Sequence, residues 1–316
     1  MKKFFVLMLC FCAFAGPRTI HGAEKDGGAL RIVTTIFPEY DWVREILGSV
    51  DAEVTLLLDR GVDLHSYQPT VDDMVRIAAC DLFIYVGGAS DTWVLDALKN
   101  AVNEHQITIG LLDVLGSSVR EEEDVEGMER GEGHEDGPEA DEHVWLSLKN
   151  AAAICRRIAG ALSELDPRHK AAFEANAARY TAKLSVLDKE YQAVVDGAAR
   201  RVLLFGDRFP FRYLVDDYGL KYYAAFAGCS AETEASFETV MFLAGKVEEL
   251  GLPCVLTLEG TRHGLAGTIV ANTDTTNQQV LSMDSMQSTA LKDIEAGATY
   301  LSIMERNLRT LSAALN

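Results

Sequence analysis

The chain has 316 residues, of which 48% are hydrophobic and 24% charged, a composition typical of a globular protein long enough for two domains. Its formal net charge of −19 argues against nucleic-acid binding, because phosphate groups attract lysine and arginine. The same charge would concentrate cations near the surface, although an acidic surface also keeps an ordinary protein in solution.

The N-terminus has the pattern of a signal peptide. Lys2 and Lys3 precede an apolar stretch at 4–14 that is too short to span a bilayer. We expect residues 1–23 to be removed and the mature chain to be exported to the periplasm or the cell exterior. Neither Cys10 nor Cys12 follows a small residue, which does not favour a lipoprotein anchor.

After this segment, β-branched apolar runs alternate with helical patterns, which predicts a parallel sheet covered by helices. The expected strands of the first half are 30–37, 52–58, 82–86 and 107–114, and the expected helices are 38–47, 71–79 and 93–102.

Residues 117–142 break this alternation with a run of carboxylates and glycines that also holds His134. The composition predicts a solvated, mobile loop, and its place just before His143 makes a metal-gathering role an equally good interpretation. A helix at 146–165 then closes the first half. From Pro167 to about Val195 the apolar spacing predicts one helix of about 45 Å at 1.5 Å per residue.

The second half repeats the alternation, with strands expected at 201–205, 221–227, 254–258 and 279–283 and helices at 211–218, 236–250, 265–272 and 298–311. The predicted fold is therefore α/β, with two β/α lobes that each hold a mainly parallel four-stranded sheet. Residues 28–165 form the N-terminal lobe with its acidic loop, 166–198 the rigid connecting helix, and 199–316 the C-terminal lobe.

Four cysteines remain after removal of the signal, and none forms a CxxC pair, which argues against a thiolate zinc site. Isolated buried thiols are the default expectation. If one disulfide exists, Cys229 and Cys254 are the pair that we expect.

Five polar side chains fall at predicted carboxyl ends of strands, the edge at which open α/β sheets bind ligands. They are His65, His143, Asp207, Glu259 and Asp284. If the two lobes face each other, these side chains converge on one cleft. Two neutral imidazoles with one or two carboxylates would suit a divalent transition metal. Asp63 and Asp141 either orient the imidazoles beside them or simply stabilise turns.

The sequence motifs around these histidines resemble those of the substrate-binding receptors of zinc and manganese ABC importers, the TroA/ZnuA-like family. The resemblance rests on Asp63–Tyr67 and Asp141–Leu146, which are similar to the D-P-H-x-Y and D-P-H-x-W-L motifs of that family. Residues 231–236 and 300–308 resemble its second-lobe stretch and its terminal helix, so that the likeness covers nearly the whole mature chain.

The resemblance implies a monomeric extracytoplasmic receptor that carries Zn²⁺, or alternatively Mn²⁺, to an ABC permease and its ATPase subunit. It also implies that Asp284 is the acidic ligand of the second lobe. The family usually has a third histidine where this chain has Arg208, which cannot bind a metal. Asp207 or Glu259 replaces that histidine, or a water molecule completes the site.

Two other functions fit an exported metal protein. A zinc-dependent hydrolase also uses three protein ligands, but the sequence has no HExxH helix. An adhesin in which the metal is structural is the third alternative. The sequence favours a receptor without catalytic activity.

Overall fold

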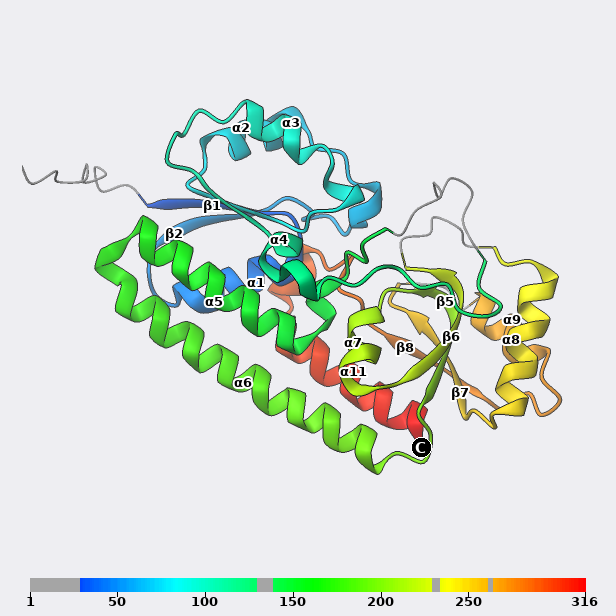
Figure 1. The fold of residues 1–316 in the computed structure, drawn as a ribbon. Helices are drawn as coiled ribbons and strands as arrows, with labels where there is room; N and C mark the ends of the chain where they lie inside the picture. Colours follow the sequence, from blue (N-terminus) through cyan, green and yellow to red (C-terminus); the bar gives the residue numbers. More distant parts are fainter. Residues whose placement is uncertain (1–28, 130–138, 229–233, 261–263) are drawn as a thin grey trace, which may run out of the picture.

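The computed structural model describes residues 29–129, 139–228, 234–260 and 264–316. Two four-stranded sheets form its frame, one in each half of the chain, and all the strand pairs are parallel (Figure 1). The predicted α/β architecture of two lobes is confirmed. The predicted signal segment, 1–23, lies outside the described residues.

The first sheet has the strand order β2-β1-β3-β4. Its strands are β1 (Leu30–Thr34), β2 (Ala52–Leu56), β3 (Leu82–Tyr85) and β4 (Ile107–Gly110), and its helices are α1 (Phe37–Leu47), α2 (Val71–Ala79), α3 (Val94–Lys99) and α4 (Leu111–Leu115). The prediction that the last strand runs to Val114 is wrong, because the chain turns into α4 after Gly110. A short apolar run does not by itself distinguish a buried strand from a buried helix.

A long helix connects the two halves, as predicted. α5 (Leu148–Leu165) and α6 (Lys170–Gly197) pack against each other along the lower side of the molecule (Figure 1). α6 has 28 residues, and one side of it is buried along its length, from Phe173 to Val195. Because α6 contacts α1 and α5 of the first half and α7 and α11 of the second, it braces both lobes.

The second sheet has the order β6-β5-β7-β8. Its strands are β5 (Val202–Phe209), β6 (Lys221–Ala227), β7 (Cys254–Leu258) and β8 (Gln279–Met283), and its helices are α7 (Arg212–Tyr218), α8 (Phe237–Glu249), α9 (Gly264–Ala271), α10 (Leu291–Glu295) and α11 (Tyr300–Leu315). β5 is longer than predicted, and its register against β6 is irregular between Phe205 and Arg208. Asp207 therefore lies inside a strand, and the prediction that it ends one is wrong.

A continuous cluster of buried apolar side chains extends from the first sheet through α5 and α6 to the second sheet. The two lobes therefore share a core, which limits how far they can move as separate bodies. None of the described helices is long and apolar enough to cross a lipid bilayer. Cys80, Cys155 and Cys254 are buried free thiols, whereas Cys229 lies outside the described residues.

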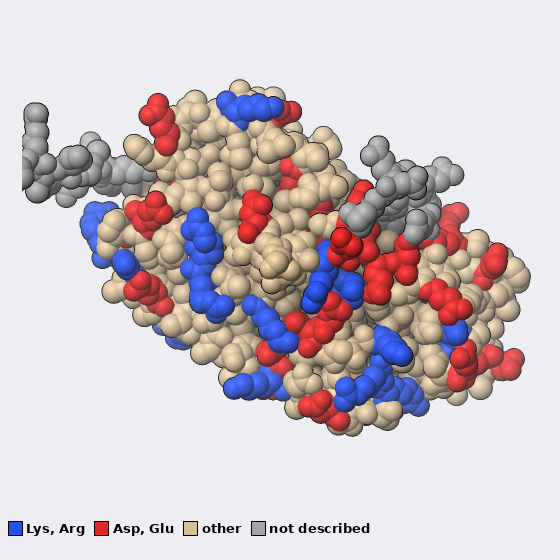
Figure 2. All heavy atoms as spheres, viewed as in Figure 1, with Lys and Arg blue, Asp and Glu red and all other residues tan. Residues whose placement is uncertain are grey.

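One described part of the acidic loop, residues 119–129, packs against the C-terminal lobe. Arg120 pairs with Asp216 at 3.0 Å, and the Glu129 amide donates to the carbonyl of Ala225 at 2.8 Å. Figure 2 shows carboxylates gathered beside the grey residues and interleaved with basic side chains. These contacts anchor the segment to the lobe, while Glu121, Glu123, Asp124 and Glu126 are exposed to solvent. His134 lies outside the described residues.

The carboxylate of Glu129 occupies the N-terminus of α8. It accepts hydrogen bonds from the Ser236 amide at 2.7 Å and the Thr239 hydroxyl at 2.5 Å. Because such caps contribute about 1 kcal/mol, we expect Glu129→Ala to lower the free energy of unfolding by about that amount. Denaturant unfolding measures the loss. Glu126→Ala is the matched control. Glu126 is 70% exposed, and its ion pair with Lys246 is long, at 3.9 Å, so its loss should cost little. Equal stability of the two variants would contradict the cap.

Candidate metal centre

His65 follows β2 in a single 3₁₀ turn, Leu64–Ser66, that begins at Asp63. The Asp63 carboxylate accepts the backbone N–H of His65 at 3.0 Å, which fixes the turn. On the ring, Nδ1 lies 2.6 Å from the Ser90 hydroxyl and 3.6 Å from a carboxylate oxygen of Glu142. That carboxylate favours a proton on Nδ1, which leaves the lone pair on Nε2.

His143 is held more tightly, by a single carboxylate. One oxygen of Asp141 accepts the backbone N–H of His143 at 2.8 Å and its Nδ1–H at 3.0 Å. The side chain of His143 is 0% exposed. Asp141 therefore both shapes the turn and orients the ring, so that Nε2 again carries the lone pair.

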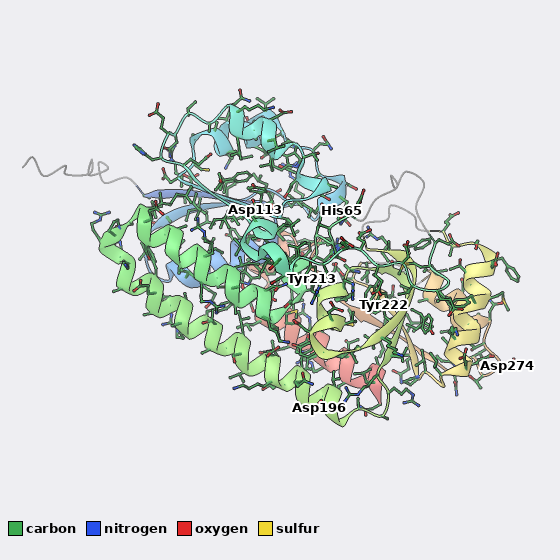
Figure 3. All side chains as sticks on the ribbon, in the orientation of Figure 1. His65, Asp113, Asp196, Tyr213, Tyr222 and Asp274 are labelled. Carbon is green, nitrogen blue, oxygen red and sulfur yellow. The ribbon has the colours of Figure 1, made fainter. Side chains whose placement is uncertain are left out.

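The segment around His143 is tied to the C-terminal lobe on both sides. The hydroxyl of Tyr213 in α7 donates to the carbonyl of Asp141 at 2.8 Å, and the indole N–H of Trp145 donates to the carbonyl of Ser285 at 2.8 Å. Figure 3 shows His65 at the junction of the lobes, with Tyr213 nearby in the second lobe. The two imidazoles thus lie where the lobes meet.

The Nε2 atoms of the two rings face each other at 3.3 Å. Two nitrogens bound to one tetrahedral zinc ion at 2.0–2.1 Å would be about 3.3–3.4 Å apart. The structure therefore brings together His65 and His143, 78 positions apart in the chain, at the separation that a shared zinc ion requires.

The two rings differ in their affinity for protons. Burial, together with the neighbouring His143 and Arg208, lowers the pKa of His65 to about 4. Burial also acts to lower the pKa of His143, but the Asp141 carboxylate outweighs it and raises that pKa above 6.5. His65 is consequently a neutral imidazole near neutral pH, and His143 is the ring of the two that binds a proton more readily.

The predicted carboxylate ligands lie elsewhere in this conformation. Asp207 accepts from the Thr257 hydroxyl at 2.7 Å and the Leu258 amide at 3.1 Å, so that it joins β5 to β7 where the strand is irregular. Glu259 accepts from the amide and the hydroxyl of Ser285 at 2.8 and 2.7 Å.

Asp284 lies in the turn after β8, three positions before Gln287. It accepts from the Met286 amide at 2.9 Å, and its other oxygen lies 3.4 Å from Arg306. Within the described ranges, no three His, Cys, Asp or Glu side chains are grouped so that they could hold a metal ion. Of the five predicted ligands, this conformation brings together the two imidazoles.

Arg208 takes part in a contact between the lobes. Its guanidinium pairs with the free oxygen of Asp63 at 3.2 Å, and the two side chains are each 23% exposed. Arg208 therefore links β5 to the turn that carries His65. Its positive charge opposes the binding of a cation beside it, which a histidine at the same place would not do.

Sequence reasoning missed Gln287, whose amide nitrogen lies 3.0 Å from Nε2 of His65 and 2.7 Å from Nε2 of His143. Gln287 is 4% exposed and follows Asp284 in the same turn. Its place after the carboxyl end of β8 is a signal for a ligand-binding position, but a glutamine is a less common metal ligand than an imidazole, a thiolate or a carboxylate.

Gly228, at the end of β6, leaves the space that the ring of His143 fills. A Cβ atom there would lie 2.7 Å from the carbonyl oxygen of Phe209 and 3.0 Å from Cε1 of His143. We expect Gly228→Ala to displace the ring and to weaken metal binding about tenfold, the smallest effect usual for changes around a ligand. Competition titration measures it. Gly245→Ala, in open space on α8, should bind as wild type does. Unchanged affinity of Gly228→Ala would contradict this placement.

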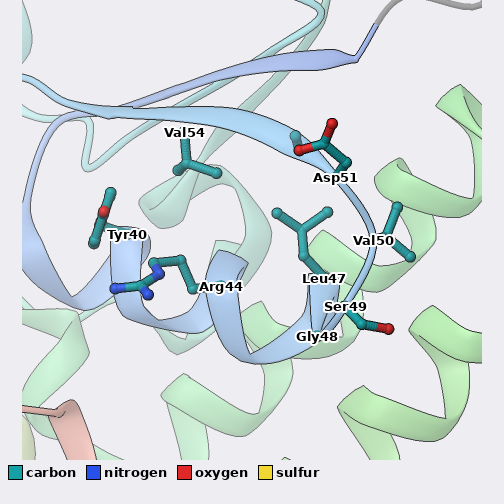
Figure 4. A pocket seen from close by; sticks show the side chains of 9 residues that line it. Tyr40, Arg44, Leu47, Gly48, Ser49, Val50, Asp51 and Val54 are labelled. Atoms are coloured by element: carbon teal, nitrogen blue, oxygen red, sulfur yellow. The ribbon is translucent and has the colours of Figure 1, made fainter.

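The molecule also has an open hollow of about 440 Å³, lined by Tyr40, Arg44, Asp51 and neighbouring residues (Figure 4). It lies at the loop between α1 and β2, where β2 begins, whereas His65 follows the end of β2. The hollow and the histidine pair share no residue. The carboxyl edge, which holds the histidines, is the usual place for a ligand in such sheets.

Sequence comparison gives the relatives of this chain. It is 32% identical over 315 residues to the zinc-binding lipoprotein AdcA of Streptococcus pneumoniae, covering 98% of this chain and 60% of AdcA. It is 28% identical to the high-affinity zinc uptake system protein ZnuA of Bacillus subtilis, covering 98% of this chain and 96% of that protein. The chain thus spans less than two thirds of AdcA and nearly all of ZnuA.

Solved structures agree with these relatives. The Zn(II)-bound ZnuA-like domain of Streptococcus pneumoniae AdcA superposes with a TM-score of 0.72 at 30% identity, over 91% of this chain and 99% of that one. The metal-dependent lipoprotein YcdH of Bacillus subtilis superposes with a TM-score of 0.75 at 26% identity, over 91% and 100%. Residues 32–314 match the family described as zinc-uptake complex component A, periplasmic (ZnuA). The chain belongs to that family, as the resemblance of its histidine motifs predicts.

Proposed function

We propose that this protein binds Zn²⁺ outside the cytoplasmic membrane and delivers it to an ABC importer. The observation that carries the proposal is the pair of Nε2 lone pairs on His65 and His143, 3.3 Å apart between the lobes. Relatives named for zinc binding and zinc uptake support the same cargo. The pattern at residues 1–23 supports export of the chain.

His65 and His143 are the two nitrogen ligands of the proposed site. Asp284, Glu259 and Asp207 remain predicted ligands, and each would have to release its present partners to reach the metal. Asp284 has the least to release, because one of its oxygens is held only by Arg306 at 3.4 Å. We also propose that the lobes comprise residues 28–165 and 199–316, and that 166–198 form the connecting helix. The protein is proposed to be a monomer.

A binding role without catalysis fits the burial of the site. The side chain of His65 is 14% exposed, and His143 and Gln287 are 0% and 4% exposed. A hydrolase must expose its metal to a substrate much larger than an ion. The closed arrangement at these side chains therefore favours an ion as the only cargo and argues against the hydrolase.

Competition titration against a chromophoric chelator tests the proposal on the exported, chelator-treated protein. We expect one equivalent of zinc to bind more tightly than manganese, as the nitrogen-rich pair predicts. Zinc-loaded protein should then stimulate ATP hydrolysis by its permease and ATPase in vesicles. Failure to bind zinc, tighter binding of manganese, or ester hydrolysis that a chelator abolishes would each contradict the proposed function.

A further inference from the structure

The amide of Gln287 occupies the lone pairs that a metal would need. Its nitrogen lies 3.0 Å from Nε2 of His65 and 2.7 Å from Nε2 of His143. The carboxylates of Asp141 and Glu142 favour a proton on Nδ1 of each ring, and with that tautomer both Nε2 atoms are acceptors that cannot bond to each other. An amide oxygen at these distances would repel the two lone pairs, so the NH₂ group, which has two donors, is the group that faces them.

The turn that carries Gln287 is held in an unusual conformation. The residue before it, Met286, has a φ of 62°, in the left-handed region that side chains other than glycine rarely adopt. The Asp284 carboxylate holds the Met286 amide at 2.9 Å, and Trp145 of the other lobe holds the carbonyl of Ser285 at 2.8 Å. Backbone strain that the surroundings maintain in this way is typical of functional positions.

The opposite end of the amide faces a group that can both donate and accept. The oxygen of Gln287 lies 3.1 Å from the Ser285 hydroxyl, which is also 2.7 Å from a carboxylate oxygen of Glu259. If the amide rotated by half a turn, its NH₂ would donate to this hydroxyl, which would still donate to Glu259. In the present orientation the single hydroxyl hydrogen of Ser285 is shared between Glu259 and the Gln287 oxygen, whereas in the rotated orientation the hydroxyl would accept from the amide and donate to Glu259. The last torsion of glutamine has broad minima, so both orientations are open to the side chain.

We propose, resting on the zinc-binding function above, that Gln287 is a two-way gate of the metal site. In the present orientation its NH₂ closes the site by bonding to both imidazoles. In the rotated orientation its carbonyl oxygen becomes a ligand from the C-terminal lobe, beside the predicted carboxylates. An amide is suited to both roles, because it donates at one end and accepts at the other.

Two substitutions separate these roles. Gln287→Glu presents a carboxylate oxygen in either orientation and, when ionised, has no hydrogen to donate to the imidazoles. Gln287→Met has a similar length, but it neither donates to the imidazoles nor offers an oxygen ligand. We expect zinc to associate faster with both variants, because the donors that compete for the imidazoles are gone. Zinc should dissociate about tenfold more slowly from Gln287→Glu and about tenfold faster from Gln287→Met, since one gains and the other loses a ligand. Gln279→Glu, at the exposed start of β8, is the matched control and should behave as wild type.

Stopped-flow association and chelator-induced dissociation measure these rates, and thermal unfolding confirms that each variant is folded. Unchanged association in both variants would overturn the closing role. Dissociation from Gln287→Met at the wild-type rate would overturn the ligand role. If Gln287→Met does not fold, Gln287→Glu decides alone, because its association must rise and its dissociation fall. Wild-type protein that binds no zinc would instead refute the proposed function.

Discussion

Replacement of His143 by alanine should lower the affinity for zinc more than 100-fold. Changes to groups that merely orient a ligand cost about 10–100-fold, and removal of the ligand itself should cost more. Of the two histidines, His143 is the better positioned to bind zinc, because it is fully buried and one oxygen of Asp141 fixes both its backbone and its ring. His65→Ala should cause a loss of the same order, since it removes the other nitrogen.

Isothermal titration on the wild type and the two variants measures these losses. His105→Ala is the control, because His105 is an exposed residue far along the chain from both motifs. It should bind zinc as wild type does. Wild-type affinity in either His65→Ala or His143→Ala would show that the pair of facing Nε2 atoms does not bind the metal.

Zinc affinity should fall about tenfold for each pH unit below the pKa of His143. A proton and the metal compete for the same lone pair, and release of one proton per metal gives this slope. The Asp141 carboxylate raises the pKa of His143 above its usual value, so a proton competes at this ring at higher pH than at His65. The pKa of His65 is lowered to about 4, so a second proton should compete only near that pH.

Competition titrations from pH 5 to 8 test this order of protonation. Asp141→Asn removes the charge that raises the pKa of His143 and should move the onset of the loss to lower pH. A slope of two protons per zinc at pH 5 to 6 would mean that both rings protonate together. A zinc affinity independent of pH would mean that neither ring is a ligand.

The sequence predicts the lobes and the histidines because both signals are local. Strands, helices and the connecting helix follow from short-range periodicity, which predicts a helix at 167–195 where the structure has α6 at Lys170–Gly197. His65 and His143 stand in turns whose own aspartates hold their backbone N–H groups. Because these turns form through hydrogen bonds between neighbouring residues, the local sequence motifs are enough to predict them.

The C-terminal half of the site was not predictable in the same way, because it depends on pairing between distant segments. The irregular register of β5 turns Asp207 toward β7, where it bonds to Thr257. Arg208 then meets Asp63, 145 positions away, and Gln287 meets His65, 222 positions away. No local pattern around Asp207, Arg208 or Gln287 encodes these contacts.

A crystal structure of the zinc-loaded protein, with anomalous scattering at the zinc edge, tests the central claim most directly. We expect one zinc ion within about 2.0–2.1 Å of Nε2 of both His65 and His143, with an oxygen ligand from the C-terminal lobe. A zinc ion bound away from either imidazole, or bound by residues of the N-terminal lobe alone, would contradict a site assembled between the two lobes.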